Sequence, residues 1–183
     1  KLNFLESIDV TDCSKLISLQ GAPNPNVFGS VSRHSSKDNP GLDVNFTNCS
    51  SLKDITALKG ISKIKSLSFS GCSSISKTEG LESIEIDDLS CHDCNINILQ
   101  NLNNLKVKRL YLYLNKSVTS LEGLKVWESV THLKINSNSS YDEKNENFKS
   151  LAGIDVFSNI NFLGLDLTYY HLDIVVDPEK RTI

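Results

Sequence analysis

The stretch "VKRLYLYLNKSVTSLEGL", residues 107–124, combines two different spacings of apolar residues. In its first half, apolar residues stand three and then two positions apart, and an Asn follows: Val107, Leu110, Leu112, Asn115. In its second half, apolar residues recur at every third position. A strand alternates with a period of two and a long helix shows spacings of three and four. We therefore expect a short strand followed by 3-10 turns or irregular coil, in which side chains eclipse every third residue.

The spacing of residues 107–115 recurs along the chain around a set of positions that we call the anchors. The anchors are Cys13, Cys49, Cys72, Cys94, Asn115, Asn138 and Thr168. Eight, five and three residues before each anchor, every residue is apolar except Gly41. The anchors from Cys49 to Asn138 follow one another at intervals of about 22 residues, a period typical of solenoids. The sequence thus predicts about seven stacked coils that share one core.

This pattern resembles the leucine-rich repeat family, whose units read LxxLxLxxN followed by xLxxLxxL. The closest unit is "VKRLYLYLNKSVTSLEGLKVWES", residues 107–129, and the interval is similar to that of the internalin-type class. The resemblance implies an α/β solenoid: a horseshoe with a parallel concave β-sheet and an irregular or 3-10 convex side. It covers nearly the whole chain, so we expect a single domain over residues 1–183. Cys stands at four anchors where the family usually has Asn.

Two segments interrupt the repeat and are predicted to be loops on the convex side. Residues 21–40 are rich in Pro, Gly, Ser and Asn, and residues 139–147 are polar and charged. Each is either a tolerated surface insertion or a binding loop. Residues 171–183, "HLDIVVDPEKRTI", are expected to close the C-terminal end of the stack.

Composition limits the classes of function and the compartment. The net charge of −3 gives no electrostatic footprint for nucleic acid, and no apolar run is long enough to span a membrane. Five cysteines, an odd number, fit a reducing compartment better than a disulfide framework. We expect a cytoplasmic protein or one delivered into a host cell. The chain contains no Met, which indicates processing or truncation, so secretion stays compatible with the sequence.

No set of residues in the sequence forms a catalytic or cofactor-binding constellation. "CHDC", residues 91–94, has the spacing of a metal or redox motif, but the repeat places Cys91 at an inward position and Cys94 at an anchor. Both are expected to be buried and inert. Trp127 lies on the apolar three-residue period, which favours core packing over a role as a binding hot spot. We expect no enzyme activity, no cofactor and no metal.

Between the inward positions of each strand lie outward positions, and these form the expected binding face. They are acidic and small in the first four coils and aromatic and basic in coils five and six. We expect a protein-binding patch of Arg109, Tyr111, Tyr113, His132 and Lys134, because Tyr and Arg are enriched at binding hot spots. We expect Asp9, Asp43 and Asp88 to steer a basic segment of the partner, and His92 and Phe162 to belong to the same face. The alternative is a merely solvated sheet.

The resemblance implies a non-catalytic protein-recognition module, bacterial, with a role in adhesion, as an effector or as a scaffold. The alternative is a stoichiometric inhibitor, such as an immunity protein or an antitoxin that masks a toxin. The small size, the reduced cysteines and the acidic part of the face are compatible with that alternative. In either case the partner is another protein, and we expect the chain to be monomeric on its own.

Overall fold

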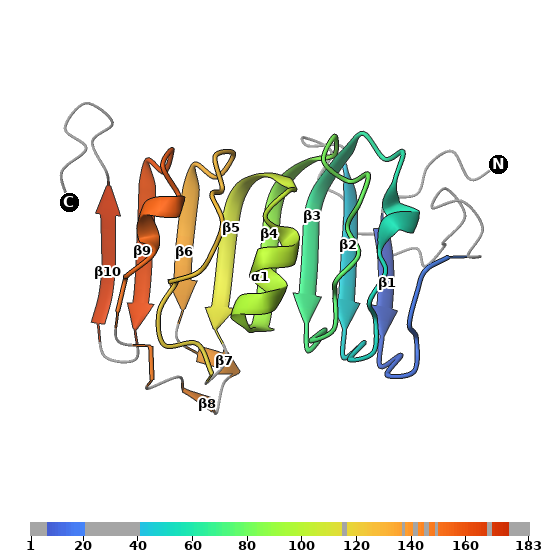
Figure 1. The fold of residues 1–183 in the computed structure, drawn as a ribbon, viewed down its shortest axis with the longest axis horizontal. Helices are drawn as coiled ribbons and strands as arrows, with labels where there is room; N and C mark the ends of the chain where they lie inside the picture. Colours follow the sequence, from blue (N-terminus) through green and yellow to red (C-terminus); the bar gives the residue numbers. More distant parts are fainter. Residues whose placement is uncertain are drawn as a thin grey trace.

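The computed structural model describes residues 7–20, 41–114, 117–136, 138–140, 143–144, 147–148, 150–167 and 170–175. Eight strands form one sheet, in which the order of the strands in space is also their order along the chain (Figure 1). The strands of the sheet are, in spatial order, β1 (Ser7–Thr11), β2 (Leu42–Thr47), β3 (Lys63–Ser70), β4 (Glu85–Cys94), β5 (Lys106–Leu114), β6 (His132–Asn136), β9 (Phe162–Leu167) and β10 (Tyr170–Val175). The first seven are parallel to one another, and β10 is antiparallel to β9. The predicted parallel sheet is therefore confirmed, and its strand order is compatible with a solenoid.

The strands pair in a register that stacks the inward residues directly on one another. The positions five residues before the anchors form one row: Ile8, Val44, Leu67, Leu89, Leu110, Leu133, Leu163. The positions three residues before the anchors form a second row: Val10, Phe46, Phe69, Cys91, Leu112, Ile135, Leu165. All of these residues are buried except Val10, which is partly buried. Phe46 and Phe69 stack with ring centroids 5.6 Å apart, so the two rows form one continuous core.

An extra residue near the start of three strands explains the spacing of three followed by two. The Cα register passes from Ile64, Ile86 and Val107 directly to the next paired row, Ser66, Asp88 and Arg109. Lys65, Asp87 and Lys108 therefore lie between two paired rows, at the same level in all three strands. This unpaired residue lets two inward residues stand three positions apart, so that Val107 and Leu110 are both buried.

The chain leaves four of the strands through a residue in the left-handed conformation, just before a Cys anchor. The residues are Asp12, Asn48, Gly71 and Asp93, with φ between 54° and 64°. Asp, Asn and Gly are the residue types that adopt this conformation most readily. Of the Cys anchors whose side chains are described, Cys49 and Cys72 turn inward and are buried, whereas Cys13 in the first coil is exposed. The sulfur of Cys72 lies 3.4 Å from the carbonyl oxygen of Phe46 in the preceding strand, which links the two coils.

The return segments are partly helical. Two short 3-10 helices, η2 (Thr56–Leu58) and η3 (Ile154–Val156), agree with the prediction of 3-10 turns. The segment after β4 is instead an α-helix, α1 (Ile96–Leu102), so the prediction of a 3-10 or irregular segment is wrong there. The side chain of Asn95 caps this helix by accepting a hydrogen bond from the Ile98 N–H at 3.1 Å. Its inward residues, Ile98, Leu99 and Leu102, have helical spacing.

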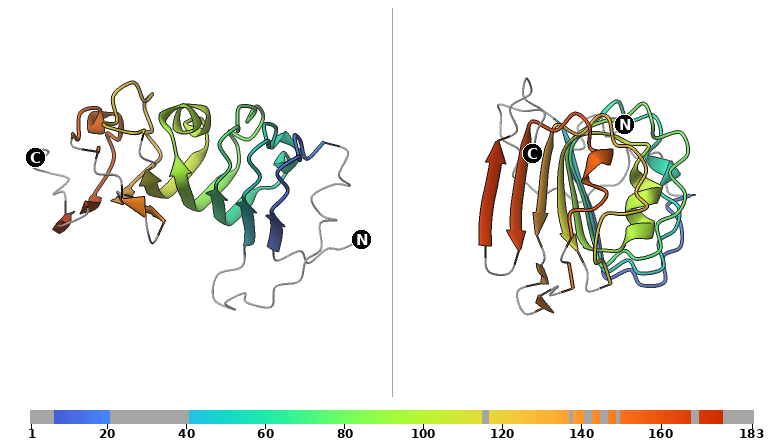
Figure 2. Two further views of the ribbon diagram at one scale, coloured as in Figure 1. Left: turned by 90° about the horizontal axis from the view of Figure 1, so that it is seen from below. Right: turned by 60° about the vertical axis from the view of Figure 1, so that its left-hand side comes forward.

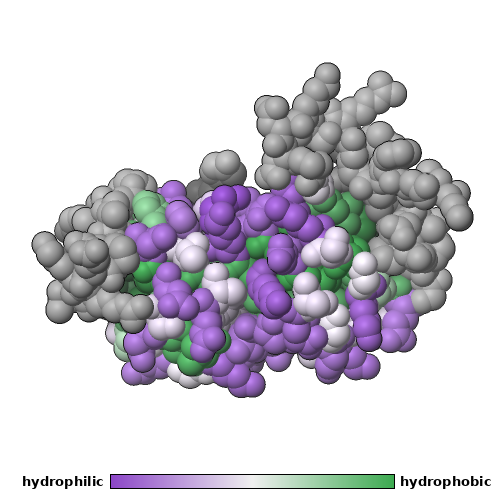
Figure 3. Space-filling view, turned by 90° about the horizontal axis from the view of Figure 1, so that it is seen from above, coloured by the Kyte–Doolittle hydropathy of each residue, from purple (hydrophilic) through white to green (hydrophobic). Residues whose placement is uncertain are grey.

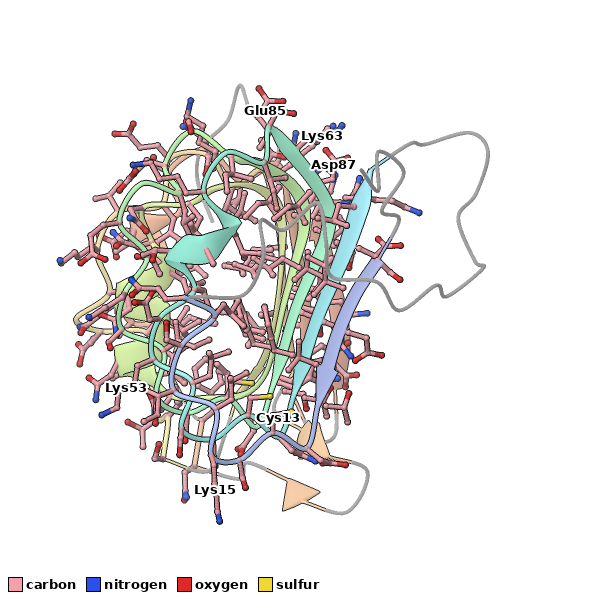
Figure 4. All side chains as sticks on the ribbon, turned by 90° about the vertical axis from the view of Figure 1, so that its right-hand side faces the viewer. Cys13, Lys15, Lys53, Lys63, Glu85 and Asp87 are labelled. Carbon is pink, nitrogen blue, oxygen red and sulfur yellow. The ribbon has the colours of Figure 1, made fainter. Side chains whose placement is uncertain are left out.

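Trp127 belongs to the core, as predicted, with 1% of its surface exposed. Its ring packs at a tilt against Phe157 in the next coil, with centroids 6.1 Å apart. Figure 4 views the stack from the β1 end and shows side chains filling the space between the sheet and the return segments.

One of the two predicted loops contains regular structure. Within residues 139–147, expected to form a loop, β7 (Asn138–Ser140) pairs antiparallel with β8 (Glu143–Lys144), because a short hairpin satisfies the backbone groups of a polar segment. Residues 21–40, the other predicted loop, lie outside the described residues. At the C-terminal end, β10 adds an antiparallel strand beside β9 over Tyr170–Val175, and residues 176–183 lie outside the description. No helix among the described residues has the length and apolar character needed to cross a membrane.

Candidate protein-binding surface

The sheet has one face covered by helices and return segments and one face that we call the open face. All the described helical segments, η2, α1 and η3, lie on the covered side (Figure 2). Three rows of residues run across the open face from β1 to β9. The first row is Ser7, Asp43, Ser66, Asp88, Arg109, His132, Phe162; the second is Asp9, Asn45, Ser68, Ser90, Tyr111, Lys134, Gly164; the third is Thr11, Thr47, Ser70, His92, Tyr113, Asn136, Asp166.

Every residue that the sequence assigned to the binding face belongs to one of these rows. Those residues are Asp9, Asp43, Asp88, His92, Arg109, Tyr111, Tyr113, His132, Lys134 and Phe162. Asp9 is exposed and the others are partly exposed. The rows place the aromatic and basic residues together on β5, β6 and β9 and leave Asp9 and Asp43 on β1 and β2.

Asp88 and Arg109 form an ion pair between β4 and β5. The Arg109 Nε–H donates to one carboxylate oxygen of Asp88, and Nη2 donates to the other at 2.6 Å. This bidentate geometry is the strongest that a guanidinium makes with a carboxylate. The hydrogen bonds from Arg109 to Asp88 raise the pKa of the guanidinium, although partial burial opposes that effect. The charge of Asp88 is therefore neutralised by Arg109 within the protein. The sequence had instead suggested that Asp88 is free to steer a basic segment of the partner.

Tyr111 lies one row below this ion pair on β5. Partial burial raises the pKa of its phenol, and the negative charge of Asp88 acts in the same direction. The phenol is protonated at neutral pH, as that of an unperturbed tyrosine also is. Lys134 is the residue opposite Tyr111 on β6.

Aromatic rings stack in pairs on the open face. His92 on β4 and Tyr113 on β5 have ring centroids 4.0 Å apart and planes inclined by 8°. His132 on β6 and Phe162 on β9 have centroids 5.8 Å apart and planes inclined by 25°. Burial lowers the pKa of His92, which favours the neutral imidazole. Packed rings lose little conformational entropy when a partner binds, and this is the property expected of anchor residues.

The carboxylates at the β1 end have a different environment. The Asp9 carboxylate accepts hydrogen bonds from the Thr11 hydroxyl at 2.8 Å and from the Asn45 side-chain amide at 3.2 Å. Among the described residues, no Lys, Arg or His lies within ion-pair distance of Asp9 or Asp43. The negative charge at this end of the open face is thus held in position without a described counter-charge.

Another charged region lies at the edge of the sheet where the parallel strands begin. Lys63 and Asp87 form an ion pair at 3.0 Å, and Glu85 lies close to them (Figure 4). An open hollow near this edge is lined by residues that include Lys106, Lys108 and Glu128. The described part of this edge is mostly hydrophilic (Figure 3). This edge carries charges of both signs, and its hollow is wide open. It is therefore a weaker candidate for a specific binding site than the open face.

The "CHDC" segment divides between the two sides of the sheet. Cys91 is buried in the core, whereas His92 belongs to the open face. The side chain of Cys94 is outside the description. Within the described part of the chain, no three His, Cys, Asp or Glu side chains gather in a way that could hold a metal ion.

The sequence did not identify the partners that these residues have within the protein. Asn45 orients Asp9, and Asn136 donates to the Asp166 carboxylate at 3.2 Å, yet neither Asn was singled out. The signal was present in the repeat: once strands are aligned by their anchors, Asp88 stands opposite Arg109 and His92 opposite Tyr113.

Comparison with known proteins gives no further guide to function. No protein-family model, no curated protein and no solved structure matches this chain.

Proposed function

We propose that the chain is a leucine-rich repeat module of the internalin type that binds another protein without catalysing a reaction. Support for the repeat class comes from the stacking of inward residues in phase and from the left-handed residue before four anchors. In this proposal the sheet is the concave side of a horseshoe, and the open face is its binding surface. Solenoids commonly recognise partners on such surfaces.

The observation that carries the proposal is the set of preorganised side chains on β4, β5, β6 and β9. The Asp88–Arg109 ion pair and the His92–Tyr113 stack hold charged and aromatic groups in fixed positions on a face of the sheet that no described helix covers. Aromatic and Arg side chains that are already immobilised are the usual centres of protein interfaces. A merely solvated sheet has no need for such packing among its exposed side chains.

The test is capture of a partner from lysates of the cells that express the protein. Wild-type protein, the open-face variant Tyr111→Ser/Tyr113→Ser and the control variant Val126→Ser are immobilised side by side. Val126 is 55% exposed and lies in a return segment, so its replacement leaves the open face intact. We expect one protein to be retained by the wild type and the control and lost from the open-face variant. Equal retention by all three would contradict the proposal.

A second candidate function uses the same surface. Asp9 and Asp43, which form no ion pair with any described residue, favour a stoichiometric inhibitor that covers a basic site of a toxin. A captured partner that binds in a one-to-one complex and loses a toxic activity on binding would distinguish this role from adhesion, effector or scaffold roles.

A further inference from the structure

The open face carries an excess of negative charge that becomes clear only when its internal contacts are known. Its three rows contain four described carboxylates, Asp9, Asp43, Asp88 and Asp166, and two cations, Arg109 and Lys134. Arg109 is engaged by Asp88, so the pair presents no net charge to a partner. Lys134 is then the one remaining described Lys or Arg in these rows.

The excess charge and the aromatic rings lie at separate places on the face. Asp9 and Asp43 lie on β1 and β2, and Tyr111 and Tyr113 lie on β5. Three strand intervals separate β2 from β5, which corresponds to about 14 Å at roughly 4.8 Å per interval. The residues between them on β3 are small: Ser66, Ser68, Ser70. A partner segment can therefore cross β3 without meeting a large side chain in these rows.

We propose that the partner binds through a basic segment that lies across the strands. A Lys or Arg of the segment pairs with Asp9 and Asp43, and an aliphatic or aromatic side chain of the same segment packs on Tyr111 and Tyr113. In an extended segment these two groups are about four residues apart, because each residue spans roughly 3.3 Å. This inference rests on the proposed function, since it names the kind of protein that the open face takes.

The charge of the face also gives the segment a direction. Its cationic end lies over β1 and β2, where no described counter-charge is present, and its other end lies toward Lys134 on β6. At the β6–β9 end the charges of Lys134 and Asp166 offset each other, whereas Asp9 and Asp43 place two negative charges on β1 and β2, so the orientation with the cation over β1 and β2 is favoured.

The test is selection from a random dodecapeptide library displayed on phage, with the whole chain as the immobilised target. We expect enriched peptides to contain Lys or Arg about four residues from an aliphatic or aromatic residue. The most enriched peptide is then synthesised, and its Kd is measured by fluorescence anisotropy. The proteins compared are the wild type, Asp9→Asn/Asp43→Asn, Tyr111→Ser/Tyr113→Ser and the control Glu79→Gln, an exposed carboxylate of a return segment.

We expect either open-face variant to raise the Kd about tenfold, which corresponds to a loss of about 1.4 kcal/mol of binding free energy. We expect Glu79→Gln to leave the Kd unchanged. For Asp9→Asn/Asp43→Asn, the residual binding should also depend less on salt. Circular dichroism melting curves of the four proteins establish that each is folded.

Three results would overturn the inference, and they differ in what they mean for the proposed function. Acidic or uncharged peptides that still lose affinity for Tyr111→Ser/Tyr113→Ser would refute the basic partner and leave the open face as a binding surface. Peptides that bind all four proteins equally would refute both. Failure to enrich any sequence would refute the basic segment alone, because the lysate experiment tests the surface independently.

Discussion

At the scale of single residues, the side chains of the open face are arranged by their neighbours on adjacent strands. Arg109 is bound by Asp88 from β4, and Tyr113 is stacked on His92 from the same strand. Each of these contacts joins two residues more than 20 positions apart in the sequence, a separation that the stack reduces to one strand interval. The chemistry of the face therefore depends on the register of the sheet as much as on the residue types.

A double-mutant cycle measures what the Asp88–Arg109 pair contributes. We expect the single variants Asp88→Asn and Arg109→Gln to lower the free energy of unfolding. The double variant should lose less free energy of unfolding than the two single variants lose together. We expect this coupling energy to be about 1 kcal/mol, because the ion pair is bidentate but about one-third exposed. Urea denaturation at low salt provides the measurement. A coupling of zero would show that the pair leaves Arg109 free for a partner.

The cysteines differ in exposure, and this difference predicts their reactivity. Cys13 is exposed, whereas Cys49, Cys72 and Cys91 are buried. Burial raises the pKa of the Cys49 thiol and raises that of Cys72 to about 11. We expect iodoacetamide to modify Cys13 in the native protein well before these three, with peptide mapping by mass spectrometry as the measurement. Equal rates at Cys13 and Cys72 would contradict the burial of Cys72 in the core.

The raised pKa of Cys72 also predicts a pH dependence of stability. In the unfolded chain the thiol titrates near pH 8.5, so the stabilisation from its burial is fully present below that pH. It is lost as the pH rises toward about 11. The free energy of unfolding of Cys72→Ala should thus fall less between about pH 8 and 10 than that of the wild type. Parallel pH profiles for the two proteins would refute the assignment.

At the scale of elements, the return segments depend on a few residues with special backbone requirements. Gly60 and Gly153 both have a positive φ, 95° and 89° respectively, so Ala is strained at each position. Their surroundings differ. A Cβ on Gly60 would meet no atom within 4 Å, whereas a Cβ on Gly153 would lie 2.4 Å from the backbone of Leu121 in the preceding coil.

This matched pair of glycines separates backbone strain from packing between coils. We expect Gly60→Ala to destabilise the protein by about 1–2 kcal/mol through its φ alone. Gly153→Ala should cost at least about 2 kcal/mol more, because two backbone segments must move apart. Urea denaturation of the two variants measures the difference. Equal losses would mean that the coils of Leu121 and Gly153 are not in close contact.

The cap of α1 provides a second test at this scale. Replacing Asn95 by Ala removes the side chain that accepts the Ile98 N–H and should cost about 1 kcal/mol. Asn97 is exposed within the same helix, and its replacement by Ala should be neutral or slightly stabilising. Thermal denaturation compares the two variants, and an Asn95→Ala protein as stable as Asn97→Ala would argue against the helix.

The elements also show which features the sequence could predict. The inward residues of the strands were predictable because a spacing of five and three residues before each anchor leaves a clear apolar pattern. The α-helix after β4 was not predictable, because its segment fits two apolar patterns equally well. A period of three is matched by Ile96, Leu99, Leu102 and Leu105, and helical spacing is matched by Ile98, Leu99 and Leu102. On the open face, residue types were predictable from alternation, whereas the pairing of Asp88 with Arg109 required the register between strands.

At the scale of the whole molecule, the parallel strands turn a local spacing into a continuous surface. A shift of one residue in any strand would expose the core residues of that strand to solvent and bury its open-face residues. The register is therefore strongly fixed. The register consequently fixes which residues of the open face are neighbours. Side chains that are packed before binding lose less entropy when a partner binds, and this is the physical basis for the proposal that the partner binds on this side of the sheet.

Hydroxyl-radical footprinting of the protein alone and in complex with its captured partner tests the central claim most directly. Oxidation of Tyr111, Tyr113, His92, His132 and Phe162 should fall markedly in the complex, because these side chains become covered. Oxidation of Ile17 and Val126, which are exposed in the return segments, should stay unchanged. Protection of Ile17 and Val126 with the five open-face residues still reactive would place the partner on the opposite side and contradict the account.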